Sequence, residues 1–146
     1  MKRRPARFSW FSKFLSELLA QLRAHAGLSP KELAERAGIS PHTIGTCERY
    51  CGRMNMDKIY GFIEGLGFDA CVVFYEVAER LDLAGKPSKL GKNPRPGVAF
   101  KLLYDAGVLD RSEVNRQLRV MRKLRKPATK RSAPGPAPKR KSRAKA

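Results

Sequence analysis

The sequence predicts a mainly α-helical protein in which one small apolar domain lies between two basic ends. Apolar residues recur at helical spacing along the first half of the chain. Ser-Pro, a pair typical of helix starts, occurs at residues 29–30 and again at 40–41. A single run, at residues 70–77, has the β-branched and aromatic composition of a strand. The expected fold class is therefore mainly α, with one β-strand after the helical domain.

The charge is unevenly distributed along the 146 residues, whose formal net charge is +18. Residues 1–8 form a basic arm of net charge +4, residues 9–83 carry −2, and residues 84–146 carry +16. An excess of this size points to a polyanionic partner, either a nucleic acid or an anionic membrane. No apolar run approaches 18 residues, so we expect no membrane-spanning segment and no membrane partner.

The first predicted helix runs from about Trp10 to Ala24 and ends at Gly27. Its apolar residues recur at intervals of three and four, as one face of a helix requires. They are Phe11, Phe14, Leu15, Leu18, Leu19 and Leu22.

Local start and stop signals predict the next helices. Ser29 can cap a second helix with Pro30 in its first turn and Glu32 completing a capping box, and Gly38 can end that helix. Ser40 and Pro41 repeat the start signal for a third helix. A fourth helix, capped by Asn55 and ended by Gly67, places apolar residues on one face at Met56, Ile59, Phe62, Ile63 and Leu66.

The run "ACVVFYEV" predicts a strand within a dimerisation segment at residues 70–83. A lone apolar strand invites pairing, and the chain offers no second strand. We therefore expect a homodimer through an antiparallel copy of this strand. The face used would carry Cys71, Val73, Tyr75 and Val77. The alternative is that this run continues a helix and packs on the C-terminal segment of its own chain.

The C-terminal half is basic throughout. Residues 84–98 are expected to be a linker, and residues 99–126 a basic helical segment, with a short helix at 99–105 and another opened by Asp110 and Glu113. Residues 127–146 contain four prolines, seven Lys or Arg residues and no acidic or aromatic residue, so they are expected to be a disordered basic tail.

Two short helices joined by a glycine turn are typical of a helix-turn-helix, and the apolar residues fit this geometry. Gly38 would form the turn, with Ile39 packed into it. The residues expected to face inward are Leu33, Ala34 and Ala37 from the second helix and Ile44 and Cys47 from the third.

From about residue 14 to residue 68 the chain resembles the Cro/phage-repressor (Xre-like) helix-turn-helix proteins. The similar stretches are "LRAHAGLSPKELAERAGIS", "TIGTCE" and "IEGLGF". The resemblance implies a five-helix domain at residues 9–69 that binds double-stranded DNA through its third helix.

The resemblance also assigns roles to particular residues, because a recognition helix contacts base edges near its N-terminus while other side chains hold phosphates. Pro41, His42 and Thr46 are expected at the bases, and Ser40, Thr43, Arg49 and Arg53 at the DNA backbone. Arg23 and Glu48 are expected to form an ion pair between the first and third helices. Gly45 is either a point of close approach to DNA or a tolerated surface glycine.

The residues give no sign of catalysis. Cys47, Cys51 and Cys71 are an odd number, which favours free thiols in a reducing cytosol. No catalytic triad or complete ligand set can be assembled, so we expect no enzyme activity, no cofactor and no metal.

The leading hypothesis is a sequence-specific transcriptional regulator, most simply a repressor, of bacterial or phage origin, located in the cytoplasm with the nucleoid. One alternative is a structural nucleoid protein, because the "PKRKSRAKA" tail resembles histone-H1-like tails. Another is an antitoxin-type regulator that binds a partner protein. An RNA or protein partner for the C-terminal region stays open.

Overall fold

The structure, a computed structural model, describes residues 9–85 and 94–125, and these residues are almost entirely helical. The elements are α1 (Ser9–Ala26), α2 (Pro30–Ala37), α3 (Pro41–Tyr50), the 3-10 turn η1 (Cys51–Arg53), α4 (Met56–Gly65), α5 (Ala70–Leu83), α6 (Pro96–Ala99), α7 (Lys101–Asp105) and α8 (Arg111–Lys123). The predicted basic arm, most of the predicted linker and the predicted tail lie outside the described residues. The described end of that linker is not a linker, because α6 already begins at Pro96.

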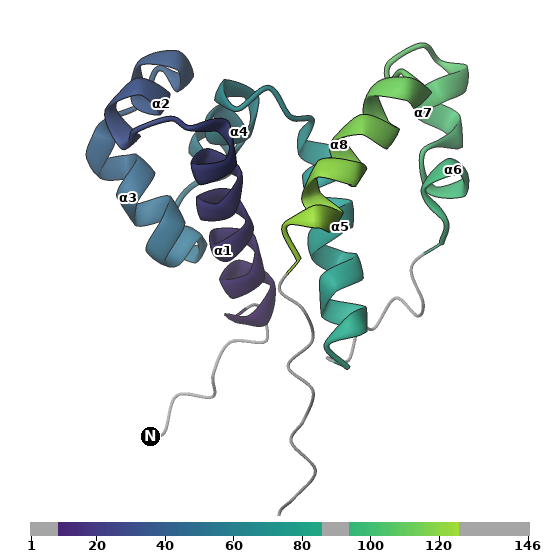
Figure 1. The fold of residues 1–146 in the computed structure, drawn as a ribbon, viewed down its shortest axis with the longest axis horizontal. Helices are drawn as coiled ribbons and strands as arrows, with labels where there is room; N and C mark the ends of the chain where they lie inside the picture. The colour runs from purple at the N-terminus through teal and green to yellow at the C-terminus, as the bar shows by residue number, and fades with distance from the viewer. Residues whose placement is uncertain (1–8, 86–93, 126–146) are drawn as a thin grey trace, which may run out of the picture.

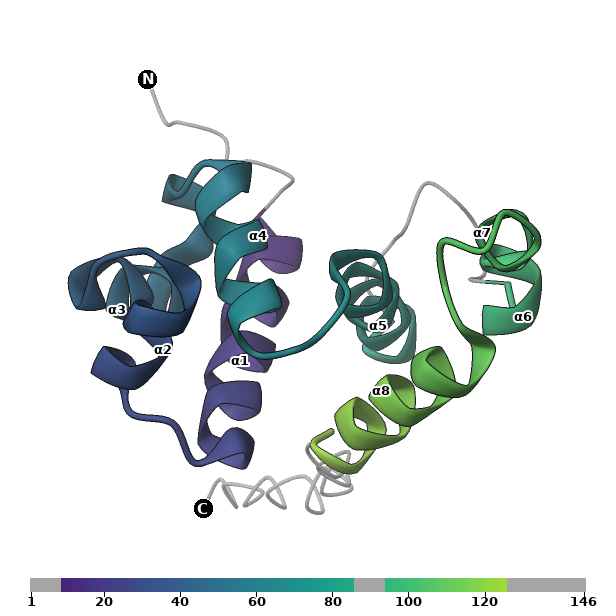
Figure 2. The same cartoon turned by 90° about the horizontal axis from the view of Figure 1, so that it is seen from above.

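Helix α1 is the centre of the fold. Helix α3 and the turn η1 pack on one side of α1, and α5 packs against the other side (Figures 1 and 2). Helices α2 and α4 pack against each other, and both contact α3. Helix α8 lies on α5, and the short α6 and α7 lie beside α5 and α8, on the side away from α1. The fully buried core side chains include Leu18, Leu19 and Leu22 of α1, Leu33 of α2, Ile44 of α3, Phe62 and Ile63 of α4, and Val72 and Val73 of α5.

The start and stop signals predicted for α2 and α4 are present. Ser29 accepts a hydrogen bond from the Glu32 N–H while the Glu32 carboxylate accepts one from the Ser29 N–H, which completes the capping box. Asn55 caps α4 by accepting from Lys58. Gly38 and Gly67 follow α2 and α4 with φ of +67° and +78°, a conformation that favours glycine.

The predicted strand at residues 70–77 is wrong, because these residues form the first two turns of α5. The Asp69 side chain accepts a hydrogen bond from the Cys71 N–H at 2.8 Å and so caps the helix. Val73 and Val77 are fully buried at helical spacing against the core. Packing has overridden the strand preference of a β-branched and aromatic run, as tertiary context commonly does. Helix α5 lies outside residues 9–69, the range expected for the five-helix domain, and that range contains α1 to α4 and the turn η1.

The strand-mediated dimer loses its structural basis with that correction. Val73 and Val77 are buried inside the chain, and Tyr75 is half-buried and donates its hydroxyl proton to the Pro94 carbonyl. Of the four residues proposed for the dimer contact, Cys71 alone is exposed. The alternative derived from the sequence, a helix packed on the C-terminal segment of the same chain, describes what is observed.

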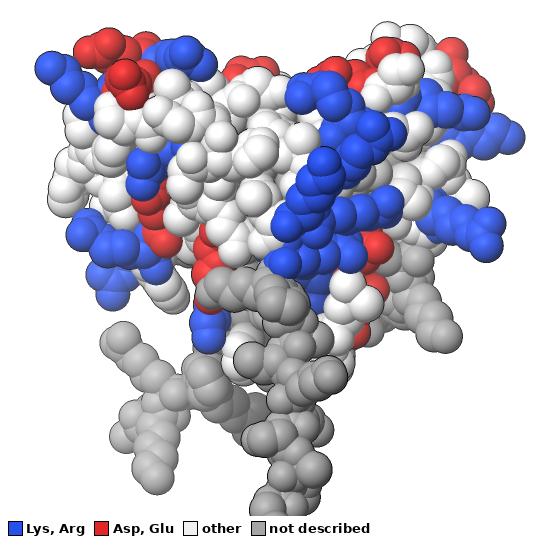
Figure 3. Space-filling view, in the orientation of Figure 1, with Lys and Arg blue, Asp and Glu red and all other residues white. Residues whose placement is uncertain are grey.

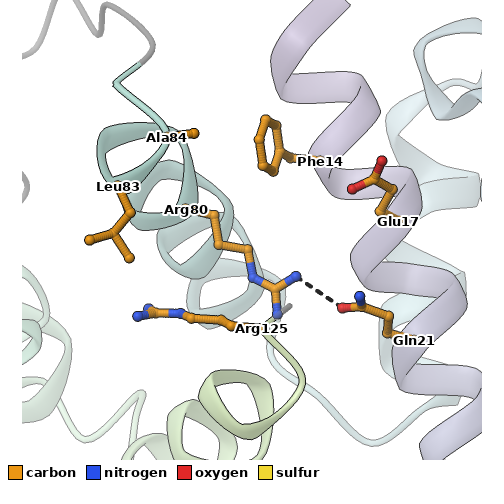
Figure 4. Close-up of a pocket in the computed structure, with 7 residues that line it drawn as sticks. All are labelled: Phe14, Glu17, Gln21, Arg80, Leu83, Ala84 and Arg125. Atoms are coloured by element: carbon orange, nitrogen blue, oxygen red, sulfur yellow. Dashed lines mark hydrogen bonds between the residues drawn. The ribbon is translucent and has the colours of Figure 1, made fainter. Parts of the chain in front are cut away.

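A buried cluster of charges joins α1, α5 and α8. The Glu76 side chain is fully buried, and its carboxylate accepts hydrogen bonds from Arg125 at 2.6 and 2.8 Å and from Arg80 at 3.2 Å. Arg80 also donates to the side chain of Gln21 in α1 at 3.0 Å (Figure 4). A second donor of the same guanidinium bonds to the Met121 carbonyl in α8 at 2.9 Å. Burial lowers the pKa of Arg80, and the hydrogen bond to Glu76 opposes that shift. One guanidinium group therefore ties together three helices.

The Glu76→Ala substitution is expected to lower the free energy of unfolding by about 3–5 kcal/mol, because it leaves Arg80 and Arg125 without their buried counter-charge. Urea unfolding followed by circular dichroism measures the change. Glu35→Ala, at an exposed position of α2, is the matched control and should shift stability by less than about 0.5 kcal/mol. Equal losses for the two variants would contradict the structural role of Glu76.

Candidate DNA-binding surface

Helices α2 and α3 form a helix-turn-helix whose turn is set by backbone hydrogen bonds. The Gly38 N–H, at the end of α2, bonds to the Ala34 carbonyl, and the Ile39 N–H bonds to the same carbonyl at 3.2 Å. Helix α3 then begins at Pro41, with Ser40 as its cap. Because three residues separate the two helices, their relative direction is fixed by this turn and by the side chains packed beneath it.

The inner face of α3 is apolar and closed. Ile44 and Cys47 are fully buried against the core that also contains Leu33 and Ala34. This burial fixes which face of α3 remains available to a ligand.

The start of α3 is held by two hydroxyl side chains. Ser40 Oγ accepts from the Thr43 N–H at 3.1 Å and lies 2.8 Å from Thr43 Oγ1. Thr43 is only 8% exposed, so it has little surface to offer a phosphate. In this structure Thr43 stabilises the first turn, in contrast to the DNA-backbone contact that was expected from the family resemblance. Ser40 is exposed.

The residues expected at the bases lie on the outer side of α3. Pro41 and His42 are exposed, and Thr46, one turn further along, is partly exposed. Thr46 Oγ1 donates to the His42 carbonyl at 3.0 Å, so its hydroxyl proton is already used. What Thr46 offers a ligand is a methyl group and an acceptor oxygen, which fits apolar contact with a thymine methyl.

Two exposed arginines, Arg49 and Arg53, follow the outer side of α3 towards its C-terminal end. The Arg53 guanidinium lies 5.5 Å from the centre of the Tyr50 ring, a cation–π distance. A terminal nitrogen of Arg49 lies 3.8 Å from the position that a Cβ atom on Gly45 would occupy. Cationic groups therefore follow, on its C-terminal side, the nearly uncharged stretch that contains His42 and Thr46.

Arg23 and Glu48 form an ion pair between α1 and α3. Arg23 Nε donates to one Glu48 carboxylate oxygen and Nη2 donates to the other at 3.0 Å. Arg23 Nη1 also donates to the Leu28 carbonyl at 2.9 Å, just before α2. The hydrogen bond to Glu48 raises the pKa of Arg23. One side chain thus connects α1, the start of α2 and the end of α3, which limits rotation of α3 on the core.

The cysteines near α3 are packed in the interior. Cys47 and Cys51 are fully buried, and burial raises the pKa of Cys47 to about 11. Cys51 Sγ donates to the Ser12 carbonyl at 3.2 Å. Within residues 9–85 and 94–125, no group of three or more His, Cys, Asp or Glu side chains is arranged to hold a metal ion.

A contact between α2 and α4 was missed by the sequence analysis. A Cβ atom on Gly65 would lie 3.0 Å from Ala37 Cβ and 3.2 Å from Leu33 Cδ1, so the two helices touch there. Gly61, one turn earlier, lies beside the Ala37 carbonyl. The spacing of four residues between Gly61 and Gly65 could have predicted this contact, because it places both glycines on one face of α4. Since neither glycine has a side chain, α2 can pack directly against the α4 backbone.

A cavity of about 430 Å³ lies between α1 and the end of α5. Figure 4 shows its lining residues, Phe14, Glu17, Gln21, Arg80, Leu83, Ala84 and Arg125. Both of its guanidinium groups are hydrogen-bonded to Glu76, and Glu17 adds a negative charge at the wall. The cavity therefore presents no uncompensated cation to an anionic ligand.

Comparison with protein families identifies the domain. Residues 15–71 match a family model described as a helix-turn-helix domain, and the match runs from α1 to the first residues of α5. Comparisons with curated proteins and with solved structures gave no match. The sequence-based prediction of a helix-turn-helix domain is confirmed. No helix among the described residues is long and apolar enough to cross a membrane.

Gly45→Ala and Gly65→Ala are expected to change stability in opposite directions. A Cβ at Gly45 meets only the flexible end of Arg49, so alanine should stabilise by about 1 kcal/mol through helix propensity. At Gly65 the same methyl group meets Ala37 and Leu33, and overpacking of about 1–3 kcal/mol should exceed that gain. Urea unfolding of both variants tests the pair, and stabilisation by Gly65→Ala would contradict the close packing.

The same Gly45→Ala variant also distinguishes the two interpretations of this glycine. Lower DNA affinity in a more stable protein would show that DNA approaches the α3 backbone at Gly45. Unchanged affinity would show a tolerated surface glycine.

One thiol per molecule, that of Cys71, is expected to react first with a disulfide reagent in the folded protein, because it is exposed, although desolvation raises its pKa too. All three thiols are expected to react in denaturant. Cys47 and Cys51 are shielded by burial, which also raises the pKa of both thiols. Absorbance of the released thiolate measures the count. Fast reaction of three thiols in the native state would contradict the packing. Protection of Cys71 that increases with protein concentration would show that a second copy covers α5.

Proposed function

We propose that the protein is a sequence-specific double-stranded DNA-binding transcriptional regulator that acts as a repressor. Its helix-turn-helix domain supports the DNA-binding part of this proposal. In this proposal it works in the cytoplasm of a bacterium, on the nucleoid, and has a bacterial or phage origin. The proposal includes no enzymatic activity and no cofactor.

The main support is the first turn of α3, which is held rigidly while its outer residues stay available. Ser40 and Thr43 hold the start of the helix, and Arg23 holds its end through Glu48. A helix so fixed can place a few side chains against base edges in the major groove. His42, Thr46 and Pro41 are the residues proposed for that contact.

The proposed phosphate contacts come from exposed groups around α3. They are Ser40, Arg49 and Arg53, and Thr43 is no longer included as a direct contact because it is buried. Arginine suits this role because its planar guanidinium donates to two phosphate oxygens at once. The near-neutral charge of α3 itself is then consistent with DNA binding, because base edges are read by hydrogen bonds and methyl contacts.

A homodimer remains part of the proposal, although its contact cannot be the predicted strand. Two half-sites of an inverted repeat lie one helical turn apart, about 34 Å, and each needs its own recognition helix. Sedimentation equilibrium with and without the selected DNA measures the number of copies bound.

Selection of bound sequences from a random duplex pool at physiological salt tests the proposed function. Enrichment of a short inverted repeat is the expected result. Absence of enrichment would instead support the sequence-independent structural nucleoid protein. DNA binding that appears only with a second protein present would support the antitoxin-type regulator.

His42→Ala and Thr46→Ala are each expected to lower discrimination between the selected site and an altered site by about 1–3 kcal/mol, the range for one good base contact. Affinities for the two duplexes, measured by fluorescence anisotropy, give the discrimination. His25→Ala, an exposed position at the end of α1, is the matched control. If both α3 variants discriminate as well as this control, these residues do not contact the bases.

A further inference from the structure

Helix α8 presents a row of basic side chains on its outer side. Figure 3 shows blue side chains forming a band along this helix. A shallow depression in the band is lined by Asn115, Arg119, Arg122 and Lys123, which recur at the spacing of one helical face. Asn115, Arg119, Arg122 and Lys123 are all exposed.

These charges are poorly compensated within the described part of the chain. Arg119 and Lys123 have no acidic partner there, whereas Arg116 is hydrogen-bonded to Glu113 at 3.0 Å. The guanidinium of Arg122 lies 3.7 Å from one carboxylate oxygen of Glu79. The same oxygen lies only 3.1 Å from Arg125, so Arg122 shares this acidic group with a closer arginine. Like charges three and four residues apart on a helix repel one another. This repulsion destabilises the free protein, and a polyanion bound at the cluster would relieve it. The cluster is therefore suited to a polyanionic partner.

The structure disfavours a membrane as that partner. An interfacial helix inserts its apolar face between lipids. The apolar face of α8 is already buried, since Val114, Leu118 and Met121 are at most 1% exposed. The basic side is therefore the part of α8 that is free to bind.

The composition of α8 favours duplex DNA over single strands. Binding of single-stranded nucleic acid relies on aromatic side chains that stack on unpaired bases. The helix "RSEVNRQLRVMRK" has no aromatic residue. A line of guanidinium and ammonium groups fits the phosphates of a duplex backbone, which need no base contact.

The position of α8 shows which DNA it can reach. Helix α3 packs on one side of α1 (Figure 1). Helix α8 packs on α5, which lies on the other side of α1 (Figure 2). Helices α1 and α5 therefore lie between α3 and α8 in the packing, which favours a different DNA segment at each of the two surfaces.

We propose that Arg119, Arg122 and Lys123 bind the phosphate backbone of a second DNA segment, so that one molecule bridges two duplexes. The inference rests on the proposed function for the first segment, which α3 holds. Binding at α8 would be independent of sequence and strongly dependent on salt.

A bridging assay with the full chain tests this inference. A short duplex carrying the selected site is immobilised and saturated with protein, and capture of a labelled, unrelated duplex is measured across a salt series. The test variant is Arg119→Gln with Lys123→Gln. The control is Lys13→Gln with Lys101→Gln, which removes the same charge from exposed positions on α1 and α7.

The parent and the control variant are expected to capture the second duplex, and the α8 variant to capture much less. For the α8 variant, the slope of log affinity against log salt should fall by about 1.8, since each lost phosphate contact removes about 0.9. Equal capture by the α8 and control variants would overturn the role of α8. Failure of the parent to capture a second duplex would overturn bridging. Capture of single-stranded RNA in place of duplex DNA would overturn the assignment of the ligand.

The outcomes for α8 and for α3 are distinguishable. If selection yields no preferred sequence, the proposed function fails, and the assay is run with an arbitrary immobilised duplex. A difference between the two double variants would then still support phosphate binding by α8, and no difference would overturn it.

Discussion

The buried carboxylate of Glu76 is the interaction on which the second half of the molecule depends. It lies in α5, and its hydrogen bonds hold Arg80 of the same helix and Arg125 beyond the end of α8. Arg80 in turn reaches α1. Buried ion pairs of this kind contribute more to a defined arrangement than to net stability, because desolvation offsets much of the attraction. The position of α8 relative to the helix-turn-helix domain therefore depends on charge geometry as well as on apolar packing.

Each of the two faces of α1 is joined to a neighbouring helix by a hydrogen bond that involves an arginine side chain. On one face Arg23 holds Glu48 of α3, and on the other Gln21 accepts from Arg80 of α5. Both contacts are made by side chains at the border of the apolar core, where a guanidinium can form several hydrogen bonds at once. Through α1, the helix proposed to read bases and the helix proposed to bind phosphates belong to one packed body.

The features that depend on neighbouring residues were predictable from the sequence. Ser29, Gly38 and Ser40 mark helix ends through contacts within four residues, and their positions were predicted from the residue types alone. The run containing Val72 and Val73 was predicted incorrectly, because strand preference is local whereas the packing that decides it comes from α1 and α8. Arg125 and Glu76 are 49 residues apart, and no local pattern connects them. Burial of Thr43, likewise, follows from the packed turn and not from its place in the motif.

Helices α6 and α7 have few buried side chains, which affects how easily this segment opens locally. Between these two short helices, Phe100 is 5% exposed, and its ring contacts those of Tyr75 and Tyr104. Leu102, in contrast, is 82% exposed. Segments with few buried contacts exchange their amide hydrogens through openings much smaller than global unfolding. The amide hydrogens of α6 and α7 are therefore expected to exchange for deuterium before those of α5 and α8.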